Sequence, residues 1–317
     1  MKRVLVTGCA GFIGSNFVDY ILETHSSWIV YGLDKLTYAG SLENLKNASQ
    51  SFRFTFLQGD ICDEVLMDDL FNKYRFDIVV HFAAETHVDR SIENPVLFNF
   101  TNYIGTSVLL ECARKYSIER FHYISTDEVY GDLPLDSQDL FGEKSPLMPS
   151  SVYSASKASA DLLTMAYSKT YGLPVSISRC SNNYGPRQYP EKLIPLVIKK
   201  AQRDEKIGLY GSGENIREWI YVIDHIRAID LIITKSSTLG EIYNIGCDER
   251  ISNLDLVKMI LSIMGKSEEL IEFIPDRLGH DRKYALSSKK IKALGWRSMY
   301  SLESALKNTV DYYLERQ

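Results

Sequence analysis

Two adjacent acids, Asp127 and Glu128, are the first candidates for chemistry in this sequence of 317 residues. They follow residues 121–125, an apolar and aromatic run typical of a short buried strand, and Gly131 bounds the polar stretch that begins at Ser125. Carboxyl groups held side by side can take different pKa values, so that one donates a proton while the other accepts one. A solvated loop is an equally open interpretation of these two acids taken alone.

A tyrosine and a lysine form the second candidate pair. Tyr153 and Lys157 open a helix that the pattern predicts to run to about Tyr171, and their spacing places them on one helical face. An ammonium group there lowers the pKa of the phenol and can also hold a ribose. The alternative is an ordinary surface Tyr–Lys pair, which is weakened only where the sequence also carries a nucleotide-binding motif.

A parallel sheet would bring both pairs to one crevice. Apolar strands predicted at residues 53–57 and 77–82 alternate with helical patterns at 62–74 and 95–116. Such alternation indicates right-handed βαβ crossovers, and the carboxyl ends of parallel strands face the ligand crevice of an open sheet. The sequence therefore predicts an α/β protein with a Rossmann-type doubly wound parallel sheet.

The N-terminal strand, residues 3–7, runs into a glycine turn and then an amphipathic helix. Gly8 permits the tight turn, Gly11 lets the backbone approach a pyrophosphate, and Gly14 lets the helix pack closely on the strand. The start of the helix points free amide groups at the phosphates. This strand, turn and helix are the context that a dinucleotide-binding motif requires.

The second strand, residues 28–33, ends in Asp34, about twenty residues after the last glycine of the turn. A carboxylate there can bind the ribose hydroxyls of adenosine and repels a 2′-phosphate. We therefore predict NAD rather than NADP as the cofactor, a preference that the neighbouring Lys35 weakens slightly. Asp60, at the end of the third strand, could meet the adenine.

The strict alternation fades after residue 190. We predict that residues 1–186 form mainly the NAD-binding domain and that residues 187–317 form mainly a smaller α/β substrate region, with a late strand at 241–245 that rejoins the sheet. The polar loop at 132–150 is long enough to serve as a lid or a substrate loop.

Three cations of this C-terminal region, Lys192, Arg217 and Arg277, are candidates to clamp a diphosphate. The net charge of -5 and the pI near 5.8 argue against a nucleic-acid or anionic-membrane partner, so a polyanionic ligand needs such local cations. For each of them, ordinary surface charge is a serious alternative.

The five cysteines are scattered and form no C-x-x-C pair, so neither a disulfide nor a metal site is expected. The sequence shows no apolar run long enough to cross a bilayer and no cleavable signal pattern. We therefore expect a cytoplasmic protein.

The glycine turn Thr7-Gly8-x-x-Gly11-x-x-Gly14 and the motif Tyr153-x-x-x-Lys157 together resemble the extended short-chain dehydrogenase/reductase family of nucleotide-sugar enzymes. Longer strings resemble the 4,6-dehydratases of that family: residues 34–40, 81–91, 125–131, 181–186, 190–195 and 277–284. The sequence departs from the pattern at Thr86, where serine is expected, and at residues 187–189.

The resemblance implies dehydration of a nucleoside-diphospho-glucose, with the dTDP-linked sugar favoured. Tyr153 would remove the O4 proton while C4 passes a hydride to NAD, and Glu128 would then take the C5 proton that the 4-ketone acidifies. Asp127 would protonate the departing C6 hydroxyl before the hydride returns to C6. Thr126 would position the sugar, and Lys157 would lower the tyrosine pKa and hold the nicotinamide ribose. Asp127 must then be protonated and Glu128 ionised near neutral pH.

Matched position by position, the cofactor-binding residues of the family fall at Gly8, Gly11, Phe12, Ile13, Gly14, Asp34, Lys35, Thr37, Asp60, Ile61, Ala83, Ala84, Thr101, Tyr153 and Lys157. The nucleotide-sugar positions fall at His87, Thr126, Asn182, Glu191, Lys192, Leu193, Tyr210, Arg217, Asn253, Arg277, His280 and Tyr284. Tyr210 and Asn253 are placed only by their position between better-matched strings.

Several alternatives stay open. A UDP-glucose 4,6-dehydratase differs only in the nucleotide, and a 4-epimerase uses the same Tyr–Lys pair and NAD but needs no acid and base such as Asp127 and Glu128. A decarboxylating relative is less favoured for the same reason, and an idle NAD-binding protein is disfavoured because the catalytic positions are intact. Because the helices at 95–116 and 152–171 carry surplus apolar positions, we expect a homodimer.

Overall fold

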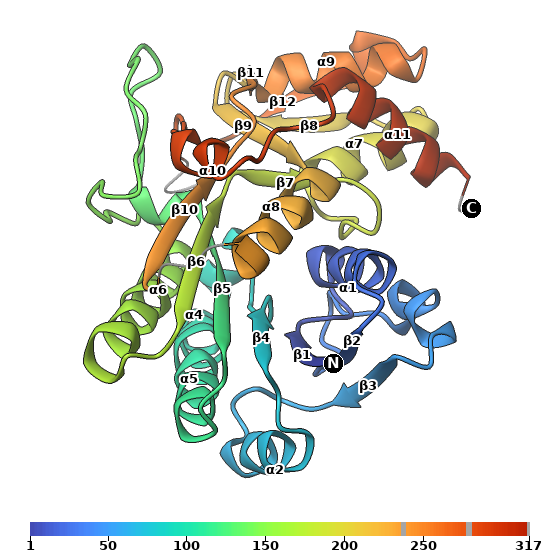
Figure 1. The fold of residues 1–317 in the computed structure, drawn as a ribbon. Coiled ribbons are helices and arrows are strands. Elements are labelled where there is room, and N and C mark those ends of the chain that lie inside the picture. Colours follow the sequence, from blue (N-terminus) through green and yellow to red (C-terminus); the bar gives the residue numbers. More distant parts are fainter. Residues whose placement is uncertain (236–238, 277–280, 316–317) are drawn as a thin grey trace.

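Seven parallel strands form the central sheet of the computed structural model, which describes residues 1–235, 239–276 and 281–315 (Figure 1). In chain order they are β1 (Lys2–Thr7), β2 (Trp28–Asp34), β3 (Phe54–Gln58), β4 (Ile78–His81), β5 (Arg120–Thr126), β6 (Val175–Cys180) and β10 (Glu241–Ile245). Their order across the sheet is β10-β6-β5-β4-β1-β2-β3, and every pairing is parallel. The order reverses between β1 and β4, which is where open α/β sheets bind ligands. The predicted Rossmann-type fold is confirmed.

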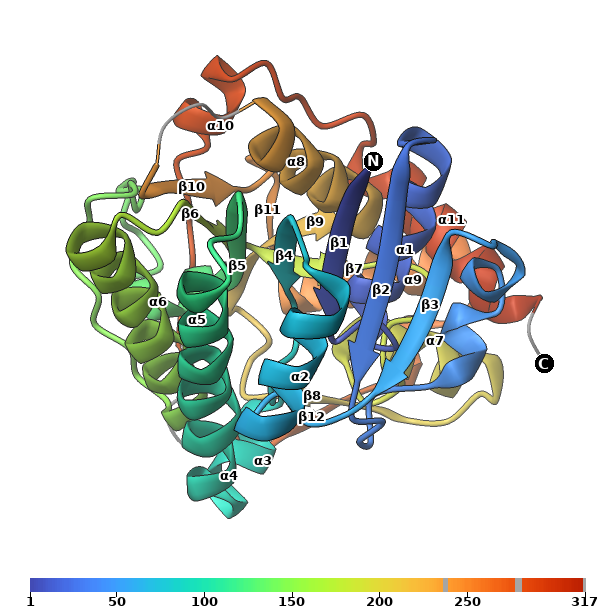
Figure 2. The same ribbon diagram turned by 60° about the horizontal axis from the view of Figure 1, so that its bottom comes forward.

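Helices cover both faces of this sheet. Val4 and Val6 of β1 belong to one apolar cluster and Leu5 to another, because alternate residues of a strand point to opposite faces. The first cluster lies under α1 (Phe12–Thr24) and α8 (Val222–Lys235). The second lies under α2 (Glu64–Tyr74), α5 (Gly105–Lys115) and α6 (Val152–Tyr171), which pack side by side (Figure 2). Burial on both faces explains the continuous apolar character of the strands.

The C-terminal region is built on two small sheets beyond the carboxyl ends of the large one (Figure 1). Its strands are β7 (Asn182–Tyr184), β8 (Ile207–Tyr210), β9 (Ile216–Tyr221), β11 (Arg250–Ser252) and β12 (Ile271–Ile274), and its helices are α7 (Leu193–Gln202), α9 (Asn253–Ile263), α10 (Lys289–Ala293) and α11 (Leu302–Leu314). Ile194, Leu256 and Leu306 of this region share one apolar cluster with Phe17 of α1. The two regions therefore have a common core.

The helix predicted at 95–116 is divided. It consists of α4 (Pro95–Asn99), a π-helical turn (Phe100–Ile104) and α5, and the short α3 (Val88–Glu93) that precedes it was not predicted. A π turn widens the helix locally and is frequent at functional sites. Helical periodicity alone does not distinguish it from a continuous α-helix.

The loop at 132–150 is bonded along its length to the segment that begins at Asp281. Asp132 pairs with Arg282 at 2.7 Å, the amide of Phe141 donates to the carbonyl of Ala285 at 2.9 Å, and Ser150 donates to Asp281 at 2.6 Å. In this arrangement the loop forms a wall of the C-terminal region.

Candidate active site

A cavity of about 760 Å³ opens at the carboxyl edge of the sheet, between the sheet and the C-terminal region. Every predicted site residue that the structure describes lines this cavity, with the exception of Tyr284. Arg277 and His280 lie outside the described residues. The fold thus gathers residues from Gly8 to Asn253 around one space.

The glycine turn closes the cofactor end of the cavity. Gly8 has a φ of +68°, and a Cβ at this position would lie 2.7 Å from the backbone nitrogen of Ala83. A Cβ on Gly14 would clash with the carbonyl oxygen of Gly8. Gly11 is the residue that caps α1, whose first amide groups have no partner within the helix. The tight turn at Gly8 and the close packing at Gly14 are the two features that the glycine spacing predicts.

Asp34 ends β2 with its carboxylate fixed by the backbone. One oxygen accepts from the amide of Ala10 at 2.9 Å and the other from the amide of Leu36 at 2.8 Å. Burial raises the pKa of Asp34, and these two hydrogen bonds oppose the rise. Its neighbour Lys35 forms an ion pair with Asp60 at 2.6 Å, which offsets the positive charge that would favour a 2′-phosphate.

The two adjacent acids begin a single 3₁₀ turn (Asp127–Tyr130) directly after β5. The Thr126 hydroxyl donates to one carboxyl oxygen of Asp127 at 3.2 Å and accepts from the amide of Glu128 at 3.3 Å. The other carboxyl oxygen of Asp127 is buried and has no hydrogen-bond partner among the described residues. This oxygen is therefore available for a proton or for a ligand.

The surroundings of Asp127 favour its protonated form. Burial raises the pKa of Asp127 well above its usual range, the charges of Glu128 and Glu218 raise it further, and Arg217 and the Thr126 hydroxyl oppose the rise. Because burial and two like charges outweigh one cation, the pKa of Asp127 is shifted in the direction that a general acid requires.

Lys157 lies under the same turn, one helical turn inside α6. Its ammonium group donates to the carbonyl of Ile124 at 2.6 Å and lies 4.3 Å from the ring centroid of Tyr123. Burial lowers the pKa of Lys157 to about 8, while Cys180 and Asp161 oppose the fall. A capping box between Ser151 and Ser154 fixes the first turn of α6, which carries the Tyr–Lys pair.

The pKa of Tyr153 is shifted opposite to the expected direction. Burial raises it well above its usual value, and Glu128, Cys180 and Asp127 raise it further. The ammonium group of Lys157 is bonded to the end of β5 while acidic groups face the phenol, and that Lys157 lowers this pKa stays a prediction. The spacing on the helix was correct, but it did not reveal which neighbours dominate.

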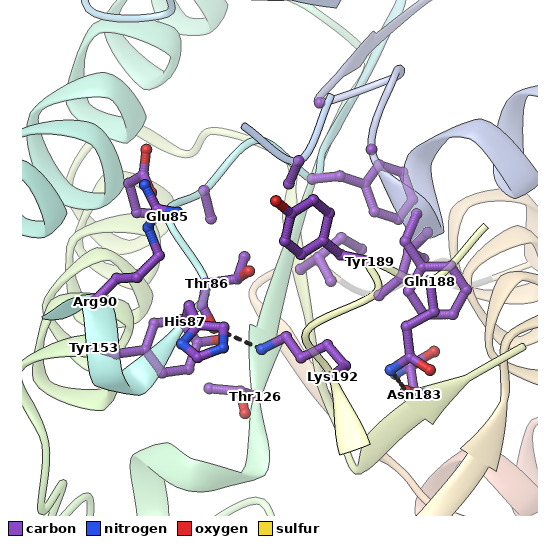
Figure 3. A pocket seen from close by; sticks show the side chains of 18 of the residues that line it. Glu85, Thr86, His87, Arg90, Thr126, Tyr153, Asn183, Gln188, Tyr189 and Lys192 are labelled. Carbon is purple, nitrogen blue, oxygen red and sulfur yellow. Dashed lines mark hydrogen bonds between the residues drawn. The ribbon is translucent and has the colours of Figure 1, made fainter. Parts of the chain in front are cut away.

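His87 and Lys192 come together from opposite sides of the cavity (Figure 3). Lys192 donates to the carbonyl of Thr86 at 3.2 Å, and His87 lies 4.0 Å from Glu191. Burial lowers the pKa of His87, and the charge of Lys192 lowers it further. A neutral imidazole and a cation are therefore presented together.

Arg217 is buried in the wall near Asp127. Its guanidinium donates to the carbonyl of Asp281 at 2.8 Å and lies 4.4 Å from the ring centroid of Tyr284. Tyr284 donates its hydroxyl to the Asp281 carboxylate. Tyr284 was predicted to bind substrate, yet it packs behind Arg217 and does not line the cavity.

An aromatic and cationic group at the cavity mouth was not predicted. The Arg90 guanidinium lies 3.6 Å from the ring centroid of Tyr38, and the rings of Tyr38 and Tyr189 meet edge to face at 5.4 Å. The strings at 34–40 and 81–91 contain two of these residues. Their contact with Tyr189 has no local signal, because 151 residues of chain separate the two tyrosines.

The cavity fits a dinucleotide and a polar second ligand. At the cofactor end, Gly8, Gly11 and Gly14 line the cavity without side chains, so that the backbone itself forms the surface there. At the other end, Asn182, Trp219 and Asn253 each have a buried polar atom without a protein partner among the described residues. Such atoms are rare in native proteins and mark places where a ligand or water makes the hydrogen bonds.

Among the described residues, no three or more His, Cys, Asp or Glu side chains are grouped so that they could hold a metal ion. In the same parts of the chain no helix combines the length and apolar character that a bilayer span requires.

The doubly wound sheet, the glycine turn and the Tyr153–Lys157 helix define a nucleotide-sugar enzyme of the extended short-chain dehydrogenase/reductase class. A family model described as GDP-mannose 4,6 dehydratase matches residues 5–309, and the chain belongs to this family.

Known relatives agree with this assignment. The dTDP-glucose 4,6-dehydratase of Salmonella typhimurium is 46% identical over 336 residues, which cover 98% of this chain and 92% of that protein. The crystal structure of dTDP-glucose 4,6-dehydratase from Bacillus anthracis in complex with NAD has a TM-score of 0.93 and 43% identity, and it covers 100% of this chain and 98% of its own. UDP-glucose 4-epimerase from Thermotoga maritima, solved with UDP-glucose, has a TM-score of 0.91 at 33% identity and covers 99% of both chains. Fold alone thus does not separate dehydratase from epimerase.

Proposed function

We propose that this protein is an NAD-dependent hydro-lyase that converts dTDP-glucose to the 4-keto-6-deoxy sugar. The observation that carries the proposal is the buried Asp127, which lines the same cavity as Glu128 and Tyr153 and whose pKa is raised by its burial and by the charge of Glu128. A 4-epimerase has no step that needs a protonated carboxyl group beside a second acid. The dTDP-glucose dehydratases among the relatives support the same activity.

Each of the predicted catalytic residues that line the cavity has a step in this reaction. Tyr153 takes the proton from the sugar O4, and Thr126 holds that part of the sugar by a hydrogen bond. Glu128 takes the proton from C5, and Asp127 gives its proton to the departing C6 hydroxyl. Bound NAD supplies the hydride chemistry, which oxidises C4 and later reduces C6.

The raised pKa of Tyr153 gives Lys157 a definite task. A tyrosine with acidic neighbours holds its proton, so formation of the phenolate that acts as the base is helped when the ammonium of Lys157 swings from the Ile124 carbonyl toward the phenol. The ammonium, with a pKa of about 8, is still mostly charged at neutral pH. We also assign to Lys157 the predicted role of holding the nicotinamide ribose.

The remaining predicted residues are proposed to bind NAD or the nucleotide-sugar substrate. The cofactor residues at the glycine turn and at Asp34 hold the adenosine and the pyrophosphate of NAD, and Lys192 and Arg217 hold the substrate diphosphate with the neutral His87 beside them. Arg277 and His280 keep their predicted substrate roles, and Tyr284 supports Arg217 from behind. With the same assignment, residues 1–186 are proposed to bind mainly NAD and residues 187–317 mainly the nucleotide sugar.

A homodimer is the proposed assembly. Val96, Phe100 and Ile104 of the α4–α5 helix and Leu162 of α6 expose large apolar side chains, with Val96 75% and Leu162 60% exposed. Two copies that pack these helices together would remove that surface from water. A monomeric mass in light scattering at micromolar concentration would contradict this proposal. The cytoplasmic location stays a prediction from the sequence.

The test of function is mass spectrometry of products from dTDP-glucose, and separately from UDP-glucose, each deuterated at C4 and incubated with the purified protein without added NAD. We expect loss of one water with deuterium at C6, and faster turnover of the dTDP sugar. Faster turnover of the UDP sugar would assign the other nucleotide. A product of unchanged mass with galactose configuration would make the protein an epimerase instead.

A further inference from the structure

We propose that a buried ion pair, Asp161 with Arg179, positions the acid–base turn by holding both of its ends. The inference rests on the proposed function, because it explains how Asp127 and Glu128 are kept in place for the elimination step. Neither Asp161 nor Arg179 lines the cavity, so both would act through the residues that they hold.

The first contact is at the start of the turn. Asp161, on α6, accepts from the hydroxyl of Ser125 at 3.1 Å and from the guanidinium of Arg179 at 2.8 Å with the same carboxyl oxygen. The side chain of Asp161 is 0% exposed and that of Arg179 is 4% exposed. Ser125 is the residue before Thr126 and is the cross-strand partner of Arg179 in the sheet.

The second contact is at the end of the turn. Arg179 donates to the hydroxyl of Tyr130 at 2.8 Å, and its guanidinium carbon lies 4.8 Å from the Tyr130 ring centroid. The Tyr130 hydroxyl in turn donates to the side-chain oxygen of Asn244 on β10 at 2.7 Å. Tyr130 is the last residue of the 3₁₀ turn, so the ion pair contacts the end of the turn through Arg179 and the residue before Thr126 through Asp161.

Four residues, Thr126, Asp127, Glu128 and Val129, lie between Ser125 and Tyr130, and the first three are the proposed catalytic residues. A buried ion pair is weak as a source of stability, since the loss of hydration offsets most of the attraction. Its effect on geometry is larger, because reacting groups displaced by about 1 Å can lose about 100-fold in rate. Lys157 is held separately by the Ile124 carbonyl. Loss of the contacts should therefore affect water elimination more than oxidation at C4.

Two variants test the contacts without removing the ion pair. Ser125→Ala deletes the hydroxyl at the first end and Tyr130→Phe deletes it at the second. We expect each to lower kcat for dTDP-glucose by about 10- to 100-fold with KM within about twofold of wild type. Bound NADH should accumulate in single turnovers of the holoenzyme, since C4 oxidation then outruns elimination. Asp161→Asn, which could prevent folding, is not needed for this test.

The matched control variants lie away from the Asp161–Arg179 ion pair and the residues that it contacts. Ser159→Ala removes an exposed hydroxyl of α6 that bonds only to the Ala155 carbonyl in its own helix, and Tyr116→Phe removes a tyrosine hydroxyl bonded to Asp68 at the surface. Both should behave as wild type, with the same melting temperature and NAD content.

The possible outcomes distinguish the positioning role of the ion pair from the proposed dehydratase function. If wild-type protein turns over dTDP-glucose while both variants keep kcat within twofold, the positioning role is wrong and the proposed function stands. The same holds if kcat falls only as far as the NAD content falls. If wild-type protein does not dehydrate any nucleotide-glucose, the proposed function is wrong, and the positioning role of the ion pair is wrong with it.

Discussion

The two ends of the cavity are built in different ways. At the cofactor end the backbone makes the surface: Gly8 adopts a left-handed φ, Gly14 leaves room for the Gly8 carbonyl, and two amide groups fix Asp34. At the substrate end, long side chains reach in from separate elements. Arg217 comes from β9 and is held by carbonyls more than sixty residues further along the chain, and Lys192 bonds to the carbonyl of Thr86.

This difference predicts how each end responds to change. A backbone site has no side chain that can move aside, so a single added methyl group disturbs both binding and folding. A side-chain site can lose one group and keep its shape, so that chemistry changes while cofactor binding remains.

The largest effect is expected at the glycine turn. Gly14→Ala places a Cβ against the Gly8 carbonyl, which is backbone and cannot rotate away. We expect a loss of about 3 kcal/mol in unfolding free energy and a weakening of NAD binding by more than about 100-fold, measured by denaturant titration and calorimetry. Gly142→Ala is the matched control, because nothing lies within 4 Å of a Cβ built there. Normal NAD content in Gly14→Ala would contradict the backbone description.

The second-largest effect is expected from a change at the substrate end that leaves the cofactor end intact. Asp127→Asn keeps the shape of the side chain but removes the proton that it donates to the leaving hydroxyl. We expect NAD binding to be unchanged and water loss to slow by about 100-fold, more than C4 oxidation. Stopped-flow absorbance of bound NADH follows the two steps separately. Equal slowing of both steps would remove Asp127 from the role of general acid.

The third prediction concerns pH and tests whether the two regions unfold together. Burial lowers the pKa of His81, His122 and His225 to about 3. In the unfolded chain these groups take up protons below about pH 6.5, while the folded protein does not, so the unfolding free energy falls as the pH drops from 6.5 toward 3. Each histidine contributes about 1.4 kcal/mol per pH unit in this window.

Two variants divide this effect between the regions. His122 bonds to Ser176 and Ser178 inside the large sheet, and His225 on α8 bonds to Asn183 at the C-terminal side. His122→Gln and His225→Gln should each lessen the acid destabilisation of one common unfolding transition, by about 2 kcal/mol at pH 5. Two transitions in calorimetry, each affected by one variant only, would show that the shared apolar cluster does not couple the regions.

The smallest effect is expected at Lys35, which is 57% exposed and paired with Asp60. Lys35→Gln should weaken NADP binding by about 2- to 5-fold and leave NAD binding nearly unchanged, because an exposed ion pair contributes at most about 1 kcal/mol. Fluorescence titration with both dinucleotides measures the ratio. Lys46→Gln, whose ammonium faces Glu43 at the surface, is the control. Tighter NADP binding in Lys35→Gln would reverse the role given to this charge.

Much of the site could be predicted from local patterns. The spacing of Gly8, Gly11 and Gly14, the acid at the end of β2, and the Tyr–Lys spacing on α6 are set within single turns or strands, and each lies where the sequence predicted. The late strand at 241–245 was also predicted, because its apolar pattern is local. The π turn at Phe100–Ile104 and the three-residue strand β7 were missed, since neither is long enough to produce a periodic pattern.

The sequence by itself determined the fold class and the cofactor turn, because those depend on neighbours in the chain, and its resemblance to the family predicted which residues act as acid and base. Only the tertiary structure decided the upward shift of the Asp127 pKa, which comes from burial, Glu128 and Glu218 of β9, and the contacts of the Asp161–Arg179 pair with Ser125 and Tyr130. It also placed Tyr284 behind Arg217 and Lys157 against the Ile124 carbonyl. These facts depend on groups that the strand order brings together from distant positions, and neither periodicity nor spacing records that order.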